Sequence, residues 1–162
     1  MSTFVFPRTF LTGFLLLTAV VVSSALPAGA DMILFKGQTI YVPVYSHIYS
    51  GDREQPFYLA ATLSIRNTDP THDITLTAVD YYDSEGKFLK HYLETPLPLK
   101  AMATKRYVVP ESDKSGGSGA KFIIRWRSDK AVAEPLIESV MISTKTQQGI
   151  SFTSRGRVLE AF

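Results

Sequence analysis

The chain has 162 residues, and its 17 lysines and arginines stand against 15 aspartates and glutamates, for a formal net charge of +2. Such a balance argues against a dedicated nucleic-acid-binding protein, which needs a basic surplus on its binding face. The sequence contains no cysteine, which excludes a disulfide framework and a thiolate metal site. The stability of the fold must therefore come from its hydrophobic core.

The first 30 residues have the composition of a signal peptide. Arg8 supplies a positive charge, residues 9–22 form an uncharged apolar run, and Ala28-Gly29-Ala30 matches the small-x-small pattern of a signal-peptidase site. The apolar run is shorter than the ~20 residues of a membrane-spanning helix, although an uncleaved membrane anchor is the alternative. We expect cleavage near Ala30 and export of residues 31–162 as one soluble domain, to the periplasm or the medium.

The pattern after residue 30 predicts short β-strands. Residues 38–46 are rich in β-branched and aromatic side chains, and Pro43 places this strand at a sheet edge or at a bulge, because proline cannot donate to a strand ladder. Residues 46–56 are polar and rich in turn formers, which predicts a loop. In residues 57–67, apolar side chains alternate with others, so one face should point to the core. That face carries Leu59, Ala61, Leu63 and Ile65.

Two turns divide the next strands. Asn67-Thr68-Asp69-Pro70 ends one strand, because Asn and Asp tolerate unusual backbone angles and Pro interrupts the ladder. Residues 73–83 resume a strand whose alternation slips at Val79-Asp80, which fits either a bulge or a strand that passes from one sheet to the other. Ser84-Glu85-Gly86-Lys87 then forms a hairpin turn into a strand over residues 87–93. Residues 95–99 are expected to cross over without regular structure.

The C-terminal half continues the pattern. Strands are predicted over residues 104–109 and 121–127, and the second should bury Phe122, Ile124 and Trp126. Residues 135–144 fit a helix by spacing and a strand by composition, and we favour a strand, because Gln147-Gln148-Gly149 then closes a hairpin onto residues 150–155. About eight strands with turns every roughly 8–12 residues predict an all-β fold, a single immunoglobulin-like antiparallel β-sandwich.

No residue pattern predicts an enzyme, a cofactor or a metal ion. The histidines at 47, 72 and 91 lie far apart in the sequence, and the acidic residues near the turns match no calcium loop. We interpret those acidic residues as solvated turn carboxylates: Asp69, Asp73, Asp80, Asp83 and Glu85. A hydrolase site assembled from distant loops is the weakest alternative.

The segment Gly116-Gly117-Ser118-Gly119-Ala120 nearly spells the G-x-S-x-G nucleophile elbow. Ala120 replaces the last glycine of that motif, and a strand follows where the motif needs a helix. Lys121 also lacks the flanking residues of a phosphate loop. We therefore interpret residues 111–119 as a flexible loop between strands.

Two arginine pairs, Arg125 with Arg127 and Arg155 with Arg157, repeat an i, i+2 spacing. If their strands are neighbours, four guanidinium groups form a basic patch that can hold carboxylates or phosphates. The alternative is a solvated sheet face. The eight tyrosines could likewise stack on sugars or contact a protein, or lie half-buried at the edges of the sandwich.

Six segments carry a family resemblance, and all of them lie after residue 30. They are Tyr41-Val42-Pro43-Val44-Tyr45-Ser46, residues 62–69, residues 81–87, residues 116–120, residues 134–141 and residues 148–156. Together they make the chain resemble the DUF3124 family of bacterial exported proteins, a domain of unknown function. The resemblance implies no activity, ligand or mechanism. Residues 63–89 are also similar to strand pairs of immunoglobulin-like and fibronectin-like sandwiches, an analogy that does not fix function.

Two hypotheses follow from the sequence. The first is a non-catalytic exported β-sandwich that binds an unknown protein or cell-envelope partner, with no nucleic acid and with no membrane contact except through an uncleaved signal segment. The second is a module that binds a small molecule, a glycan or an anion through the tyrosines or the arginine pairs.

Overall fold

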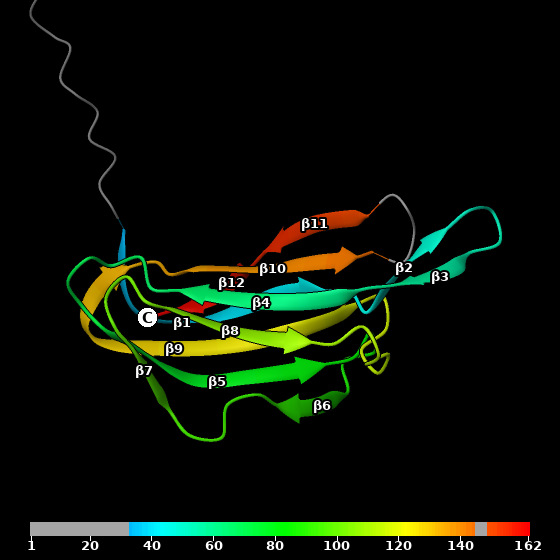
Figure 1. The fold of residues 1–162 in the computed structure, drawn as a ribbon. Coiled ribbons are helices and arrows are strands. Elements are labelled where there is room, and N and C mark those ends of the chain that lie inside the picture. Colours follow the sequence, from blue (N-terminus) through cyan, green and yellow to red (C-terminus); the bar gives the residue numbers. More distant parts are fainter. Residues whose placement is uncertain (1–32, 145–148) are drawn as a thin grey trace, which may run out of the picture. The chain divides into compact units, whose positions relative to one another are not determined.

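The structure is a computed structural model, and it describes residues 33–144 and 149–162. The predicted signal peptide, and Gln147 and Gln148 of the predicted hairpin turn, lie outside these ranges. Every regular element in the described residues is a β-strand (Figure 1). The all-β class is therefore confirmed, with twelve strands where about eight were expected. Within the same ranges, no helix has the length and apolar character needed to cross a membrane.

The strands form two large antiparallel sheets and a separate hairpin. The first sheet contains β1 (Leu34–Val44), β5 (Ile74–Tyr82), β6 (Phe88–His91), β7 (Leu97–Leu99), β9 (Ala120–Ala133) and β12 (Arg157–Ala161). Its order is β12-β1-β9-β5-β6, and β7 also pairs with β5. The second sheet contains β4 (Ala60–Arg66), β8 (Thr104–Val109), β10 (Leu136–Ser143) and β11 (Ile150–Arg155), in the order β11-β10-β4-β8. The hairpin consists of β2 (His47–Ser50) and β3 (Gln55–Tyr58).

One hydrophobic core receives side chains from both large sheets. The predicted inner face of residues 57–67 is confirmed, because its four apolar side chains are each at most 1 % exposed. On β9, Phe122, Ile124 and Trp126 are buried to the same degree, as predicted. Side chains of β1 and β5 join them in the same cluster. Alternation along most of these strands thus gives each large sheet an inner, apolar face and an outer face.

Pro43 lies in β1, which is an interior strand over part of its length. β1 pairs with β9 as far as Val44, but its pairing with β12 stops at Tyr41. The carbonyl oxygen of Pro43 accepts a 2.5 Å hydrogen bond from the Ser139 hydroxyl. The N–H and C=O of a strand residue point to the same side of the strand. The N–H that Pro43 lacks would therefore point to this locally unpaired side, where its absence breaks no ladder hydrogen bond.

The structure differs from the sequence prediction at three places. Residues 46–56 are not one loop, because they contain β2 and the first half of β3, joined by a turn in which Gly51 has a φ of +68°. β5 has one register shift between Leu76 and Ala78, in its pairing with β9, and another between Tyr81 and Tyr82, in its pairing with β6, so neither lies at the predicted Val79-Asp80. Residues 97–99 form the short strand β7. Conversely, residues 136–143 are a strand, as favoured, and pair with β11.

Candidate functional site

The structure separates the four arginines that the sequence suggested as one patch. Arg125 and Arg127 lie on β9, and Arg157 lies on β12 of the same sheet, with β1 between the two strands. Arg155 is the last residue of β11, which belongs to the other large sheet. The condition for a four-arginine patch, that the two arginine-bearing strands are neighbours, is therefore not met. Arg125, Arg127 and Arg157 share the outer face of the first sheet, and Arg155 stands apart.

Gly156 is the residue at which the chain passes from one sheet to the other. Its N–H donates a 2.9 Å hydrogen bond to the carbonyl oxygen of Ile137. A Cβ atom on Gly156 would lie 2.8 Å from Cγ2 of Ile40 and 3.1 Å from the oxygen of Ile137, which is too close for an ordinary side chain. The absence of a side chain therefore lets the backbone pass close to both sheets. A glycine between two arginines at a strand end was the signal in the sequence for this change of sheet.

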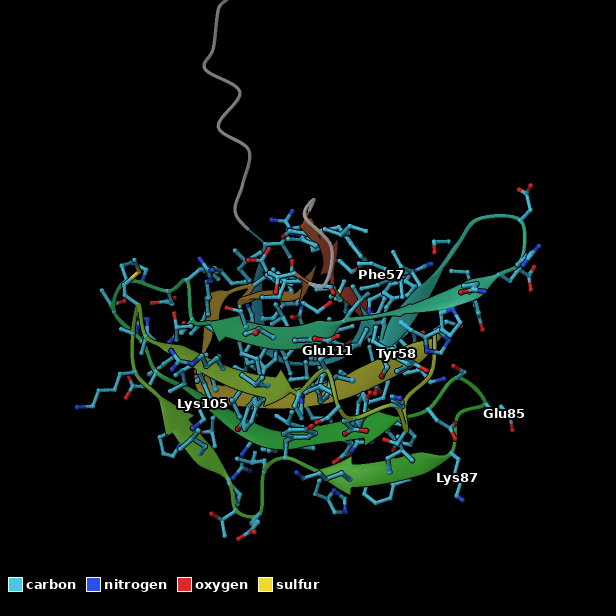
Figure 2. The ribbon with its side chains drawn as sticks, turned by 45° about the vertical axis from the view of Figure 1, so that its right-hand side comes forward. Phe57, Tyr58, Glu85, Lys87, Lys105 and Glu111 are labelled. Atoms are coloured by element: carbon cyan, nitrogen blue, oxygen red, sulfur yellow. The ribbon has the colours of Figure 1, made fainter. Side chains whose placement is uncertain are left out.

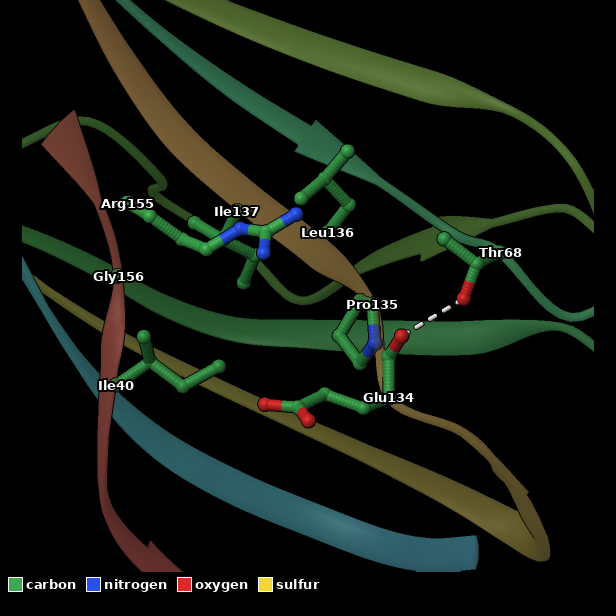
Figure 3. Close-up of a pocket in the computed structure, with 8 residues that line it drawn as sticks. All are labelled: Ile40, Thr68, Glu134, Pro135, Leu136, Ile137, Arg155 and Gly156. Atoms are coloured by element: carbon green, nitrogen blue, oxygen red, sulfur yellow. Dashed lines mark hydrogen bonds between the residues drawn. The ribbon is translucent and has the colours of Figure 1, made fainter. Parts of the chain in front are cut away.

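A hollow of about 370 Å³ opens beside this crossing (Figure 3). Its buried walls come from Ile40, Pro135 and Ile137, while Thr68, Glu134 and Arg155 are exposed at its rim. The lining thus comes from β1, the turn after β4, the start of β10 and the end of β11. The full lining is Ile40, Thr68, Glu134, Pro135, Leu136, Ile137, Arg155 and Gly156.

Arg155 places a positive charge at the rim of the hollow. Its register partner on β10 is Glu138, but that carboxylate forms its ion pair with Arg66, at 3.5 Å. Among the described residues, Arg155 and Glu134 each have no ion pair. Figure 3 shows the Arg155 side chain extending over Ile137, and the Glu134 carboxylate extending toward Ile40. A guanidinium group of this kind can bind a carboxylate through two parallel hydrogen bonds.

The turn after β4 fixes the wall that Glu134 and Pro135 form. The Thr68 hydroxyl donates a 2.7 Å hydrogen bond to the carbonyl oxygen of Glu134. The side-chain amide of Asn67 donates to the carbonyl oxygens of His72, Leu99 and Lys100, at 2.8 to 3.2 Å. Since these bonds join the turn both to β7 and to the start of β10, the position of the pocket wall depends on the turn.

Asp69 is the most heavily bonded carboxylate of this turn. Its Oδ1 accepts from the backbone N–H of Thr71 at 2.9 Å and of His72 at 2.8 Å, and its Oδ2 accepts from the N–H of Ala133 at 3.3 Å. The bond from Thr71, together with those from His72 and Ala133, holds the pKa of Asp69 well below its usual range, although burial acts in the opposite direction. Asp69 is 6 % exposed, so it is not a solvated turn carboxylate as predicted.

A second buried carboxylate, Asp80, lies on the outer face of the first sheet. It is 7 % exposed, which corrects the prediction of a solvated group here as well. Its Oδ1 lies 2.7 Å from Nδ1 of His91, and its Oδ2 lies 3.7 Å from a terminal nitrogen of Arg125. Sequence reasoning missed this cluster because its members come from three different strands. Across residues 33–144 and 149–162, no group of three or more metal-ligating side chains is placed to hold a metal ion.

Aromatic rings fill the core between β5, β8 and β9. The ring of Phe122 lies 4.9 Å from that of Tyr81 and 5.3 Å from that of Tyr92, which in turn lies 5.8 Å from that of Tyr107. Burial raises the pKa of Tyr81 and of Tyr107, and it raises the pKa of Tyr92 to about 12, with a further contribution from the charge of Asp113. These tyrosine rings therefore pack in or against the hydrophobic core at this end of the sheets.

The glycine-rich loop packs against the same end. The carbonyl oxygen of Gly116 accepts from the N–H of Ser84, and that of Gly117 accepts from the N–H of Ser46, both at 2.9 Å. A Cβ atom on Gly116 would collide with the hydroxyl of Tyr81. The loop predicted to be flexible is therefore anchored by these bonds. By contrast, Glu85 and Lys87 project outward at the tip of the neighbouring β5–β6 turn (Figure 2).

Comparison with known proteins gives one family and one distant structure. The family model described as "Protein of unknown function (DUF3124)" matches residues 37–159. The solved structure described as "Crystal Structure of Thermotoga maritima 1070" is similar at 10 % sequence identity with a TM-score of 0.45, over 77 % of this chain and 97 % of that chain. A search of curated proteins found no match. All residues that line the hollow fall within the range matched by the family model.

Proposed function

The chain belongs to the DUF3124 family, whose description names no activity, and we propose that it is a non-catalytic binding domain for a protein partner. The partner presents a carboxylate on an apolar body to the hollow beside Gly156. The observation that carries this proposal is the guanidinium group of Arg155, which has no ion pair within residues 33–144 and 149–162 and lies at the rim of buried apolar walls. Pockets that bind small groups combine apolar walls with a few polar side chains that fix orientation, as this one does.

The chemistry of the rim favours the end of a polypeptide chain. A C-terminal carboxylate would bind Arg155 through two charge-assisted hydrogen bonds, and the last side chain would lie against Ile137 and Pro135. Glu134 is an exposed acceptor for the N–H groups of the same peptide. Within the described residues, β11 pairs only with β10, so its other edge is open to an extended peptide.

A binding role agrees with the groups at the rim. The Thr68 hydroxyl already donates to the carbonyl oxygen of Glu134, and no described histidine or cysteine lines the hollow. A nucleophile would need a base within hydrogen-bond reach. The rim of Arg155, Glu134 and Thr68 supplies charge and hydrogen bonds for holding a group, and it lacks such a pair.

Export and fold type belong to the same proposal. The composition of residues 1–30 supports a cleaved signal peptide, so the partner is a protein or component of the cell envelope or its surroundings. Two antiparallel sheets around one core support the description of the domain as an immunoglobulin-like sandwich. Fold type does not determine the ligand, which we assign from the pocket alone.

Matched probes test the proposal on the purified protein. N-acetyl-leucine has an apolar body and a carboxylate, N-acetyl-leucinamide has the same body without the charge, and acetate has the charge without the body. A ligand of the native state raises the melting temperature by mass action, so N-acetyl-leucine should raise it and the other two should have much smaller effects. Equal shifts for the acid and the amide, or no shift with any probe, would overturn the proposal.

The alternative is a domain that binds a free small molecule or anion in the same hollow. A free acid can satisfy Arg155 and the apolar walls, but it leaves the edge of β11 unused. A tripeptide ending in leucine therefore separates the two functions. A protein-binding site should bind the tripeptide more tightly than N-acetyl-leucine, because the peptide adds contacts along β11, whereas equal or weaker binding of the tripeptide favours the small-molecule site.

A further inference from the structure

The buried carboxylate of Asp80, on the outer face of the first sheet, is the centre of a second cluster of polar side chains. Asp80 points away from the core, between the inward-facing Val79 and Tyr81, yet it is 7 % exposed. It is covered by its partners, because His91 lies 2.7 Å from one oxygen and Arg125 lies 3.7 Å from the other. A buried carboxylate needs such partners, and it holds them in place in return. The two partners remain open to solvent, with side chains 65 % and 52 % exposed.

An aromatic surface continues from this cluster along β6. The Phe88 ring lies 4.4 Å from the His91 ring and 5.7 Å from the Tyr82 ring, measured between centroids. Tyr82 and Phe88 are register partners, so they stand on the same face of the sheet. Phe88 is 42 % exposed. A ring with an open face therefore lies directly beside the polar cluster.

The polar groups of the cluster keep unused hydrogen-bonding capacity. An ionised carboxylate only accepts, so Nδ1 of His91 is the donor in its 2.7 Å bond with Asp80. Nε2 of His91 has no hydrogen-bond partner among the described residues, so it can bond to a ligand group. The 3.7 Å contact of Arg125 with Asp80 exceeds hydrogen-bond length, which leaves the donors of its guanidinium group available. This surface thus offers Nε2 of His91, the guanidinium donors of Arg125 and the exposed face of the Phe88 ring to one ligand.

Of the common ligand classes, a sugar uses all of these features. A pyranose ring has an apolar C–H face that packs on an aromatic ring, and its hydroxyls both donate and accept. A simple anion would leave Phe88 unused and would meet the negative charge of Asp80, while a purely apolar ligand would leave the polar groups uncovered. We propose that this surface binds a glycan, with a sugar ring on Phe88 and its hydroxyls on His91 and Arg125.

The test is a titration of the purified protein with glucose, galactose, N-acetylglucosamine and cellobiose, followed by NMR chemical shifts or calorimetry. We expect at least one sugar to bind and Phe88→Ala to weaken binding by about tenfold or more, because the stacking surface is lost. Arg125→Gln should weaken the binding of the same sugar, while Asp80 stays hydrogen-bonded to His91. The melting temperature of each variant verifies that the domain is folded.

A matched aromatic pair elsewhere in the chain provides the control. Tyr49 on β2 is also exposed, and its ring lies 5.1 Å from that of His47, but its only hydrogen-bonded partner in the described residues is that histidine. Tyr49→Ala should leave sugar binding unchanged. Arg155→Gln should also leave it unchanged, which makes this inference independent of the pocket. The proposal is overturned if no sugar binds, if Tyr49→Ala weakens binding as much as Phe88→Ala, or if acetate or phosphate displaces the sugar.

Discussion

The hydroxyl of Thr68 donates a 2.7 Å hydrogen bond to the carbonyl oxygen of Glu134, which lies 66 residues further along the chain. The next residue, Asp69, accepts a bond from the N–H of Ala133 at 3.3 Å. One turn after β4 therefore holds the last residue of β9 and the residue that follows it. Because Glu134 and Pro135 line the hollow together with Arg155, the turn fixes one wall of the hollow.

Loss of the Thr68 bond should loosen this wall. Thr68→Val keeps the shape of the side chain and removes the donor, so the free energy of unfolding should fall by about 1 kcal/mol. N-acetyl-leucine should also bind more weakly, because Glu134 and Pro135 lose an anchor. Urea denaturation and calorimetry measure the two effects. Thr153→Val on β11 is the control, since the Thr153 side chain is exposed and makes no hydrogen bond within the described residues, and equal effects of the two substitutions would contradict the role of Thr68.

Asp69 should make stability depend on acid pH. In the unfolded chain its pKa is the ordinary 3.8, and in the folded protein the N–H groups of Thr71, His72 and Ala133 lower that pKa. Below pH 4 the unfolded state therefore binds a proton first, and the stability contributed by the ionised carboxylate is lost as the pH falls toward the folded pKa. Asp69→Asn should be less stable than the wild type at pH 7, and the difference should shrink between pH 4 and pH 2. A constant difference, measured by urea denaturation across this range, would show that the charge of Asp69 has no such role.

Gly156 should tolerate no side chain. Gly156→Ala places a methyl group against Ile40 and the carbonyl oxygen of Ile137, and such overpacking costs about 1–3 kcal/mol. Gly149→Ala is the matched control, because the nearest atom to a Cβ there is the Ser143 carbonyl oxygen at 3.6 Å, an ordinary contact, and its effect should stay within about 0.5 kcal/mol. Thermal denaturation compares the two variants. Similar melting temperatures would mean that the close approach at Gly156 relaxes without cost.

The sequence predicted what depends on local spacing. Period-two alternation identified the buried faces of β4 and β9, because successive side chains of a strand point to opposite sides. The hairpin turn before residue 88 was also predicted from its composition, and Gly86 adopts the positive φ of +86° that such a turn requires. These features are decided within a few residues of each other, so one sequence contains the information.

Both sites depend on pairings that local spacing does not determine. Arg155 and Arg157 have the spacing of one strand face, but Gly156 sends them to different sheets. Asp80 meets His91 and Arg125 only because β5 pairs with β6 on one side and β9 on the other. The hollow likewise joins four separate segments of the chain. The residue types of the two proposed sites were visible in the sequence, and the residues that they contact were not.

Calorimetric titration with N-acetyl-leucine tests the binding role of the hollow most directly, with Arg155→Gln and Arg157→Gln as a matched pair. Both substitutions remove one exposed positive charge, and only Arg155 lines the hollow. The wild type and Arg157→Gln should bind the acid equally well, whereas Arg155→Gln should weaken binding by about tenfold or more, as expected for the loss of hydrogen bonds to a charged group. Equal binding by the two variants would contradict the assignment of Arg155 as the carboxylate-binding residue.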